Sequence, residues 1–500
     1  MMEKAELMKL QNGSDVRGVA VEGIEGEHVN LKEEAANRIA TGFVRFLEKK
    51  TGRSADKLKI MVGHDSRITA DKIKTAVLEA FTAEGVQAVD SGLSSTPAMF
   101  MSTVFEDTDM DGAVMITASH LPFNRNGLKF FTKDGGAEKA DITAILEMAA
   151  DSGVQKGDAS KAGKFDLIER YSAHLRDKIQ MALKGGDKPL EGMHIIVDAG
   201  NGAGGFFANK VLAPLGADIE GSQFLEPDGM FPNHIPNPEN KEAMEAIQKA
   251  VLSSKADLGL IFDTDVDRMS AVLPDGEEVN RNALIAMMAA VLAPDYPGST
   301  IITDSVTSDE LTEFLTQELK LKHHRFKRGY KNVINECIRL NKEGEVSPLA
   351  IETSGHGALS ENYYLDDGAY LAVKLVIAAA RAKKNNSQLS SLIDKLKSPA
   401  EAREFRIKIM LEDGFKEYGS DVLDKFRERA KEQGIAIAEP SYEGVRLKFD
   451  GGWALLRLSL HDPVMPLNIE SSRAGGLEPI VTKVKELLEG FDKLSGGIFE

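Results

Sequence analysis

The chain has 500 residues, of which 42% are apolar and 28% are charged, and its formal net charge is −17 at pH 7. This length predicts more than one domain, and the composition is ordinary for a globular protein with ample core material. The acidic balance argues against a general nucleic-acid or membrane-surface binder, so an anionic ligand would be held by locally clustered Arg and Lys.

The cysteine content and the N-terminal residues indicate the cellular compartment of the protein. Cys337 is the one cysteine of the sequence, which excludes an internal disulfide and suits a reducing environment. The first residues, MMEKAELMKLQ, contain no apolar signal core. The longest apolar runs, such as 283–293, fall short of the ~20 residues of a membrane-spanning helix. We therefore expect a cytoplasmic protein.

The N-terminal part of the chain alternates predicted strands and helices. After a polar loop at 12–18, an amphipathic helix is marked by Leu31, Ala35, Ile39, Phe43 and Leu47. Asn30 and Glu33 are its expected caps, and Gly52 its expected end. Strands are predicted at 58–62 and 112–116, and a second helix between them ends at Gly85. This alternation predicts a mixed, largely parallel sheet with helices on both faces.

The same alternation recurs twice before the pattern changes. The second unit has predicted strands at 193–197 and 257–262, and the third has strands at 300–303 and 348–351 with a helix near 309–319. Beyond a polar stretch at 384–399, strands and helices read as an α+β layer with a hairpin across 450–452. We expect an α/β protein with three similar domains with mixed sheets, at 1–165, 166–277 and 278–395, and a C-terminal α+β domain at 396–500.

The most informative segment follows the predicted strand 112–116 and reads TASHLPFNRNGLKFF. Ser119 and His120 lie on the loop at the carboxyl end of that strand, where open α/β sheets place their chemistry. Arg125 and Lys129 surround the serine with cations, and no nearby acid competes, which suits a serine that carries phosphate. A polar strand-to-loop junction would explain the Ser-His pair alone, but it explains the whole segment poorly.

This segment resembles the active-serine segment of the α-D-phosphohexomutases, the phosphoglucomutase/phosphomannomutase family. In that family the serine is phosphorylated and exchanges its phosphoryl group with a sugar phosphate. The resemblance implies that Ser119 is the nucleophile and that His120 and Lys129 are the candidates for proton transfer. It also implies that four domains surround a central cleft.

Three aspartates, Asp263, Asp265 and Asp267, directly follow the predicted strand 257–262. Their carboxylates converge only if the loop curls, and they repel one another unless a cation neutralises them. Oxygen ligands favour Mg²⁺, although a solvated acidic loop is an equal alternative on these residues alone. The segment DTDVDR resembles the family's metal loop, DGDADR. This implies that the three aspartates and Ser119 hold Mg²⁺ and that Arg268 contacts the phosphoryl group.

The third unit contains a segment, ETSGH at 352–356, that resembles the family's sugar loop, GE-x-SGH. Glu352, Ser354 and His356 are therefore candidate substrate ligands. Ile351 stands where the family usually has glycine. Thr353 occupies the position that varies among glucose, mannose and glucosamine enzymes, so the sugar stays open.

Two basic residues match other family loops. The segment RGYK at 328–331 resembles the loop that brings a lysine to the sugar, which makes Lys331 a candidate substrate ligand. The loop 12–18 resembles the family's N-terminal loop ending in Arg-Gly, which makes Arg17 a candidate phosphate contact. Without the neighbouring matches, each would be interpreted as a surface cation.

The last domain departs from the family pattern. The family's distal phosphate loop reads R-x-S-x-T-E-P, and this chain has RLSLHDP at 457–463. Arg457 and Ser459 are in place, but His461 replaces threonine and Asp462 replaces glutamate. Because this loop should hold the phosphate that does not react, the change bears on affinity, on the substrate and on the reaction that is favoured.

Taken together, these motifs imply a Mg²⁺-dependent isomerase that interconverts hexose 1-phosphate and hexose 6-phosphate, of glucose or mannose. The reaction would pass through a phosphoserine and a hexose 1,6-bisphosphate, with glucose 1,6-bisphosphate as activator, in a monomer or homodimer. Two rivals share the scaffold: a phosphoglucosamine mutase and a hexose-1,6-bisphosphate synthase. A third is a silent sugar-phosphate sensor, against which the intact Ser119, Lys129 and aspartates argue. A nucleotide-dependent kinase is weaker, since no Walker lysine follows the glycine run 200–205.

Overall fold

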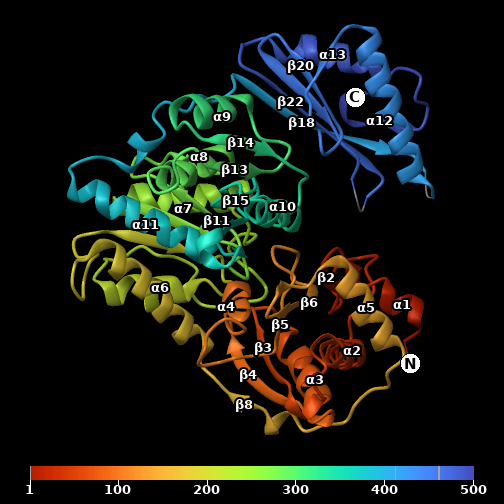
Figure 1. Ribbon diagram of the computed structural model, residues 1–500, viewed down its shortest axis with the longest axis vertical. Helices are drawn as coiled ribbons and strands as arrows, with labels where there is room; N and C mark the ends of the chain where they lie inside the picture. The colour runs from red at the N-terminus through yellow and green to blue at the C-terminus, as the bar shows by residue number, and fades with distance from the viewer. Residues whose placement is uncertain (1, 412, 460–461, 500) are drawn as a thin grey trace. The chain divides into compact units, whose positions relative to one another are not determined.

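The computed structural model describes residues 2–411, 413–459 and 462–499 (Figure 1). These residues form two compact units. Unit 1 comprises the residues up to Leu284 together with Ser354–Leu392, and unit 2 comprises Ile285–Thr353 together with the residues from Ile393 onward. Within the described ranges, no helix combines the length and the apolar character that a membrane-spanning segment requires.

The N-terminal part of unit 1 is a mixed sheet with helices packed against it (Figure 1). Its strands are β1 (Gln11–Asn12), β2 (Asp15–Val19), β3 (Lys59–His64), β4 (Gln87–Leu93), β5 (Gly112–Ile116), β6 (Arg125–Thr132), β7 (Gly135–Gly136) and β8 (Gly163–Lys164). Its helices are α1 (Lys4–Met8), α2 (Glu33–Thr51), α3 (Ala70–Ala83), α4 (Thr96–Met101) and α5 (Lys139–Ala150). The strands pair in the order β1-β2-β6-β5-β3-β4-β8, with β7 on β6; the run β5-β3-β4-β8 is parallel and the other pairs are antiparallel.

Helix α2 follows its sequence signals except at its first turn. Its buried side chains include the predicted apolar stripe, and Gly52 closes it in the left-handed region at φ 70°. The residue at the N-cap is Lys32, so the prediction that Asn30 caps the helix is wrong. The Asn30 carboxamide instead accepts a hydrogen bond from the Val19 N–H at 2.8 Å, which ties the chain before α2 to strand β2.

The rest of unit 1 contains a second mixed sheet. The elements are α6 (Leu167–Leu183), β9 (Ile195–Asp198), α7 (Lys241–Ser254), β10 (Leu258–Phe262), β11 (Met269–Val272), β12 (Glu278–Val279), β16 (Gly357–Leu359), β17 (Leu365–Asp366) and α11 (Gly368–Lys384). Strands pair in the order β12-β11-β10-β9, in which β9 and β10 are parallel, and β16 pairs with β17 antiparallel. The glycine run is a turn that leads into a short π-helix, Phe207–Leu212.

Unit 2 combines parallel strands with an antiparallel sheet. Its elements are β13 (Thr300–Thr303), α9 (Asp309–Glu313), β14 (Lys322–Arg325), α10 (Tyr330–Lys342), β15 (Leu349–Ile351), β18 (Glu401–Ile409), α12 (Phe415–Glu432), β19 (Ala436–Ile437), β20 (Val445–Phe449), β21 (Gly452–Leu456), β22 (Val464–Ser471), α13 (Leu477–Leu488) and β23 (Leu494–Ser495); α8 (Arg281–Leu292) leads into it from unit 1. Strand β13 pairs in parallel with β14 and β15, whereas β19-β20-β21-β22-β18-β23 are antiparallel throughout.

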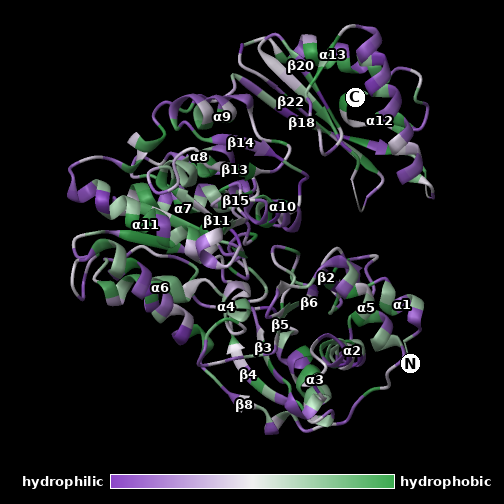
Figure 2. Cartoon of the chain, in the orientation of Figure 1, coloured by the Kyte–Doolittle hydropathy of each residue, from purple (hydrophilic) through white to green (hydrophobic). Residues whose placement is uncertain are grey.

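Helices α12 and α13 cover the antiparallel sheet through an apolar stripe on each. In α12 the buried residues Val422, Phe426 and Ala430 recur every four positions, and Figure 2 shows hydrophilic and hydrophobic residues alternating along it. The predicted fold class, α/β layers followed by a C-terminal α+β layer, is confirmed in the described part of the chain. The four domain boundaries stay predictions.

Candidate functional site

Ser119 lies three residues beyond the end of β5, on the loop that connects β5 to β6. Ser119 is 1% exposed and adopts a left-handed backbone conformation at φ 49°. A non-glycine residue in that region is uncommon, and such strain persists only where the surroundings fix it. The Ser119 N–H donates to the Thr117 hydroxyl at 2.9 Å, which helps to hold the turn.

Arg67, which follows the parallel neighbour strand β3, fixes the same loop. Its guanidinium is fully buried and donates to backbone carbonyls of the loop, at 2.7 Å to Pro122, 2.8 Å to Arg125 and 2.6 Å to Leu121. A further hydrogen bond reaches the carbonyl of Ser119 itself. No sequence motif pointed to this residue, because its partners are main-chain atoms more than fifty positions away.

Replacing Arg67 with lysine is expected to lower the free energy of unfolding by about 3 kcal/mol and activity by roughly tenfold or more. A lysine ammonium has three donors in no fixed fork, so it leaves buried carbonyls without partners and the serine loop loosely held. Denaturant unfolding and steady-state kinetics measure the two effects. The matched control is Arg45→Lys, at an exposed side chain of α2, and equal behaviour of the two variants would contradict this role for Arg67.

The loop after β10 brings Asp263, Asp265 and Asp267 together. All three are fully buried, and ligand oxygens of the three lie within 4.8 Å of one another. Val266 makes this possible with a left-handed backbone at φ 68°, a strained conformation for a β-branched residue. The expected curl of the loop is therefore present, and it turns alternate carboxylates to one side.

Burial of these carboxylates leaves negative charge to be neutralised. Burial raises the pKa of Asp263 well above its usual range, and the charges of Asp267 and Asp265 add to that shift. Burial opposes ionisation of Asp267 as well, but Lys129 and other cations outweigh it and hold its pKa below the usual range. Asp265 Oδ1 and Asp267 Oδ1 have no hydrogen-bond partner among the described residues. Buried carboxylate oxygens without partners are the donor set that a small divalent cation such as Mg²⁺ requires, so the residues fit this metal.

Ser119 lies directly against the acidic loop. Its hydroxyl donates to Asp263 Oδ2 at 2.9 Å, and it lies 3.3 Å from His120 Nδ1. Lys129 Nζ lies 2.5 Å from Asp267 Oδ2 and 3.1 Å from Asp265 Oδ2. The serine, the histidine, the lysine and the aspartates predicted from three separate motifs therefore form one cluster within unit 1.

His120 is neutral in this cluster. Burial, together with the positive charges of Arg268, Arg17 and His356, lowers its pKa to about 2. A neutral imidazole has a free ring nitrogen that can accept a proton, but so low a pKa makes it a weak base, and the role of His120 in proton transfer stays a prediction. The Arg268 N–H donates to Asp263 Oδ1 at 3.3 Å, and Arg17 pairs with Asp15 at 2.9 Å.

Part of the sugar loop belongs to the same unit. His356 forms an isolated antiparallel bridge with Arg268, and its Nδ1 lies 2.6 Å from Asp366 Oδ2. Gly355 has a φ of 93°, and a side chain there would come within 2.8 Å of the Met269 carbonyl oxygen, so the close approach needs glycine. The Ser354 hydroxyl is buried without a hydrogen-bond partner among the described residues. Asp366, which no motif singled out, orients His356.

The remaining predicted ligands lie in unit 2. Glu352 is 2% exposed and accepts a hydrogen bond at 2.5 Å from the N–H of Gly329, the N-cap of α10, whose first turn carries Lys331. Arg457 is buried at the end of β21, and its Nη2 donates to Asn468 at 3.2 Å. The Ser459 hydroxyl accepts from the Asp462 N–H at 3.2 Å. His461 lies outside the described residues.

Comparisons with known proteins agree with this arrangement. Models described as phosphoglucomutase/phosphomannomutase alpha/beta/alpha domains I, II and III match residues 8–156, 169–276 and 280–396. A phosphomannomutase/phosphoglucomutase of Pseudomonas syringae pv. tomato is 29% identical over 426 residues, covering 84% of this chain and 85% of the relative. A phosphoglucomutase/phosphomannomutase of Thermococcus kodakarensis is 28% identical over 468 residues, covering 93% and 94%. A phosphoglucomutase/phosphomannomutase family protein from Burkholderia thailandensis has the same fold, with a TM-score of 0.78 at 24% identity over 98% of both chains.

Proposed function

The chain belongs to the phosphoglucomutase/phosphomannomutase family of isomerases, and we propose that it interconverts hexose 1-phosphate and hexose 6-phosphate through a phosphoserine at Ser119. The observation that carries this proposal is the cluster of Ser119, His120 and Lys129 with the three aspartates in unit 1. The preferred hexose, glucose or mannose, is left to experiment.

The proposed reaction makes two phosphoryl transfers, one from Ser119 to the sugar and one from the sugar to Ser119. In the first step the bond from phosphorus to Ser119 Oγ breaks, and a bond forms to the free hydroxyl oxygen of the hexose monophosphate. His120 and Lys129 are the candidates for proton transfer: neutral His120 can accept the proton of that hydroxyl, and Lys129, an ammonium beside Asp265 and Asp267, can donate a proton to the departing Ser119 oxygen. In the second step the bond from the other phosphorus to its sugar oxygen breaks and a bond forms to Ser119 Oγ. The Ser119 hydroxyl proton leaves and the freed sugar oxygen takes up a proton through the same groups.

Asp263, Asp265 and Asp267, with an oxygen on Ser119, would hold Mg²⁺. The bound ion would supply positive charge to the transferring phosphoryl group, as such transfers require. Arg268 and Arg17, whose charges already act on His120, would contact the phosphoryl oxygens. Lys331, Glu352, Ser354 and His356 would bind the sugar, and Arg457, Ser459 and His461 the phosphate that does not react.

One departure supports a second candidate function. The distal phosphate loop has RLSLHDP in place of R-x-S-x-T-E-P. A mutase must keep the bisphosphate bound while it reorients, and this loop would bind one of its phosphates with different side chains. A hexose-1,6-bisphosphate synthase would charge Ser119 from an external bisphosphate or similar donor and release the doubly phosphorylated sugar.

An assay with resolved products tests the proposal. The protein is given Mg²⁺, a trace of glucose 1,6-bisphosphate, and either glucose 1-phosphate, mannose 1-phosphate or glucosamine 1-phosphate. We expect the 6-phosphate of glucose or mannose to accumulate. Accumulating bisphosphate with little isomer would establish the synthase, preference for glucosamine would establish the phosphoglucosamine mutase, and no conversion of any sugar would support a silent sensor.

A further inference from the structure

The Glu443 carboxylate accepts hydrogen bonds from two arginines of unit 2, from the main chain of one and from the guanidinium of the other. The main-chain N–H of Arg328 donates to Glu443 Oε2 at 3.1 Å, and Arg457 Nη1 donates to Oε1 at 3.5 Å. The Ser305 hydroxyl also donates to Oε2. Glu443 therefore joins the segment that leads to Lys331 with the start of the distal phosphate loop, although the two are far apart in sequence.

A second carboxylate, Asp304, lies beside the same arginines. Asp304 is fully buried at the end of β13, and the Nε of Arg328 lies 4.0 Å from its Oδ2. Burial raises the pKa of Asp304, while the positive charges of Arg328 and Arg457 act against that rise. The same Oδ2 accepts from the Thr353 hydroxyl at 2.7 Å, so Asp304 also anchors the variable position of the sugar loop. Both guanidinium groups are thus held near one buried anion.

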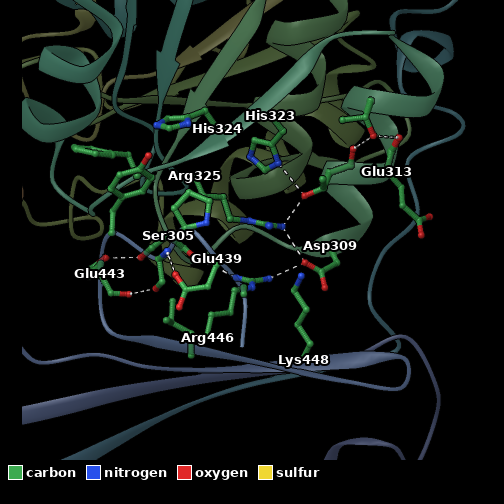
Figure 3. Close-up of a pocket in the computed structure, with 18 of the residues that line it drawn as sticks. Ser305, Asp309, Glu313, His323, His324, Arg325, Glu439, Glu443, Arg446 and Lys448 are labelled. Atoms are coloured by element: carbon green, nitrogen blue, oxygen red, sulfur yellow. Dashed lines mark hydrogen bonds and ion pairs between the residues drawn. The ribbon is translucent and has the colours of Figure 1, made fainter. Parts of the chain in front are cut away.

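Arg328 and Arg457 differ from the other arginines of this region. Arg325 and Arg446 line a cavity of about 520 Å³. Figure 3 shows both side chains directed at Asp309, and both donate to Asp309 and to carbonyl or hydroxyl oxygens. These two guanidinium groups tie parts of unit 2 together. Arg457 instead keeps a buried Nε without a hydrogen-bond partner among the described residues, and the Arg328 side chain is 33% exposed. Of these two pairs, Arg328 and Arg457 are held by carboxylates and can still bind a ligand.

We propose that Arg328 is a second phosphate ligand, which acts with Arg457 on the phosphate of the hexose phosphate that does not react. The proposal rests on the proposed function for the identity of the ligand. Guanidinium forks match phosphate oxygens, and Asp304 and Glu443 hold Arg328 and Arg457 in place before the phosphate arrives. Lys327, Arg328 and Lys331 concentrate positive charge within five residues of a chain with a net charge of −17. Arg328 would supply donors where the family's threonine is replaced in the distal loop.

Calorimetric titration of the full chain tests this role. Every protein carries Ser119→Ala so that nothing turns over, and glucose 6-phosphate, inorganic phosphate and glucose are titrated separately. Arg328→Gln is expected to weaken binding of glucose 6-phosphate and of inorganic phosphate about tenfold or more, the range for charge-assisted hydrogen bonds. Arg328→Lys should retain part of the affinity, and Arg457→Gln combined with Arg328→Gln should lose less than the sum of the two single effects, because both arginines bind one phosphate.

Arg406→Gln is the matched control, since Arg406 is an exposed arginine of the same unit. Thermal unfolding of each variant separates lost contacts from lost folding. Unchanged phosphate binding in Arg328→Gln, or an equal loss for uncharged glucose, would overturn the proposal. Because inorganic phosphate is titrated without any reaction, phosphate binding that depends on Arg328 would stand even if the chain isomerised no hexose phosphate.

Discussion

Replacing Ser119 with alanine is expected to lower the rate of hexose phosphate isomerisation by at least on the order of 10⁴-fold. The Ser119 hydroxyl is the group that would give a phosphoryl group to one sugar position and receive one from the other. In the described part of the chain, no other hydroxyl contacts both Asp263 and His120. The measurement is product formation from glucose 1-phosphate in the presence of Mg²⁺ and a trace of bisphosphate.

Ser102→Ala is the matched control for this substitution. Ser102 is equally buried, but its hydroxyl donates to the Met99 carbonyl at 2.7 Å in the helix before β5, away from the aspartates. Its removal should leave activity within a few fold of the unmodified protein. Isomerisation that survives in Ser119→Ala at the rate of this control would end the assignment of Ser119 as phosphoryl carrier.

Removal of divalent metal is expected to lower the rate of isomerisation by about 10³-fold. Asp265→Asn should lower the rate by a similar factor even in saturating Mg²⁺. Asp265 offers an oxygen without a hydrogen-bond partner among the described residues, so asparagine there weakens the metal site while it preserves shape. Mg²⁺ at about 100 times its dissociation constant should also stabilise the protein by about 2.7 kcal/mol, read as a rise in Tm.

The exposed Asp187→Asn serves as the comparison, because it changes the net charge equally without touching the site. It should keep both the activity and the Tm response to Mg²⁺. An Asp265→Asn variant that responds to Mg²⁺ as strongly as Asp187→Asn would show that the acidic loop is not the metal site.

The candidate site was predictable where its chemistry is local in sequence. The segment around Ser119 and the loop from Asp263 each keep their reactive groups within a few residues, directly after a buried strand. Their mutual contact, such as the hydrogen bond between Ser119 and Asp263, followed only from the resemblance to a family. Helix boundaries came from local signals and mostly agree, for example Gly52 at the end of α2.

What escaped prediction depends on distant partners. Arg67 acts through carbonyl oxygens, which every sequence offers, so nothing marks it as the support of the serine loop. Asn30 looked like a helix cap, but strand β2 competes for its carboxamide. The strained backbone of Val266 is fixed by surrounding contacts, among them the hydrogen bond from Gly368 N–H to its carbonyl, rather than by its own propensity. The partners of Arg328, Glu443 and Asp304, are likewise distant in sequence, so its surroundings could not be predicted from the motif RGYK.

Transfer of an isotopic label from Ser119 tests the central claim most directly. The protein is charged with ³²P from labelled glucose 1,6-bisphosphate, freed of excess ligand, and mixed with unlabelled glucose 1-phosphate and Mg²⁺ for a single turnover. We predict that the label leaves Ser119 and appears in hexose bisphosphate and hexose 6-phosphate as fast as product forms. Label that stays on the protein while glucose 1-phosphate is converted would contradict a phosphoserine mechanism.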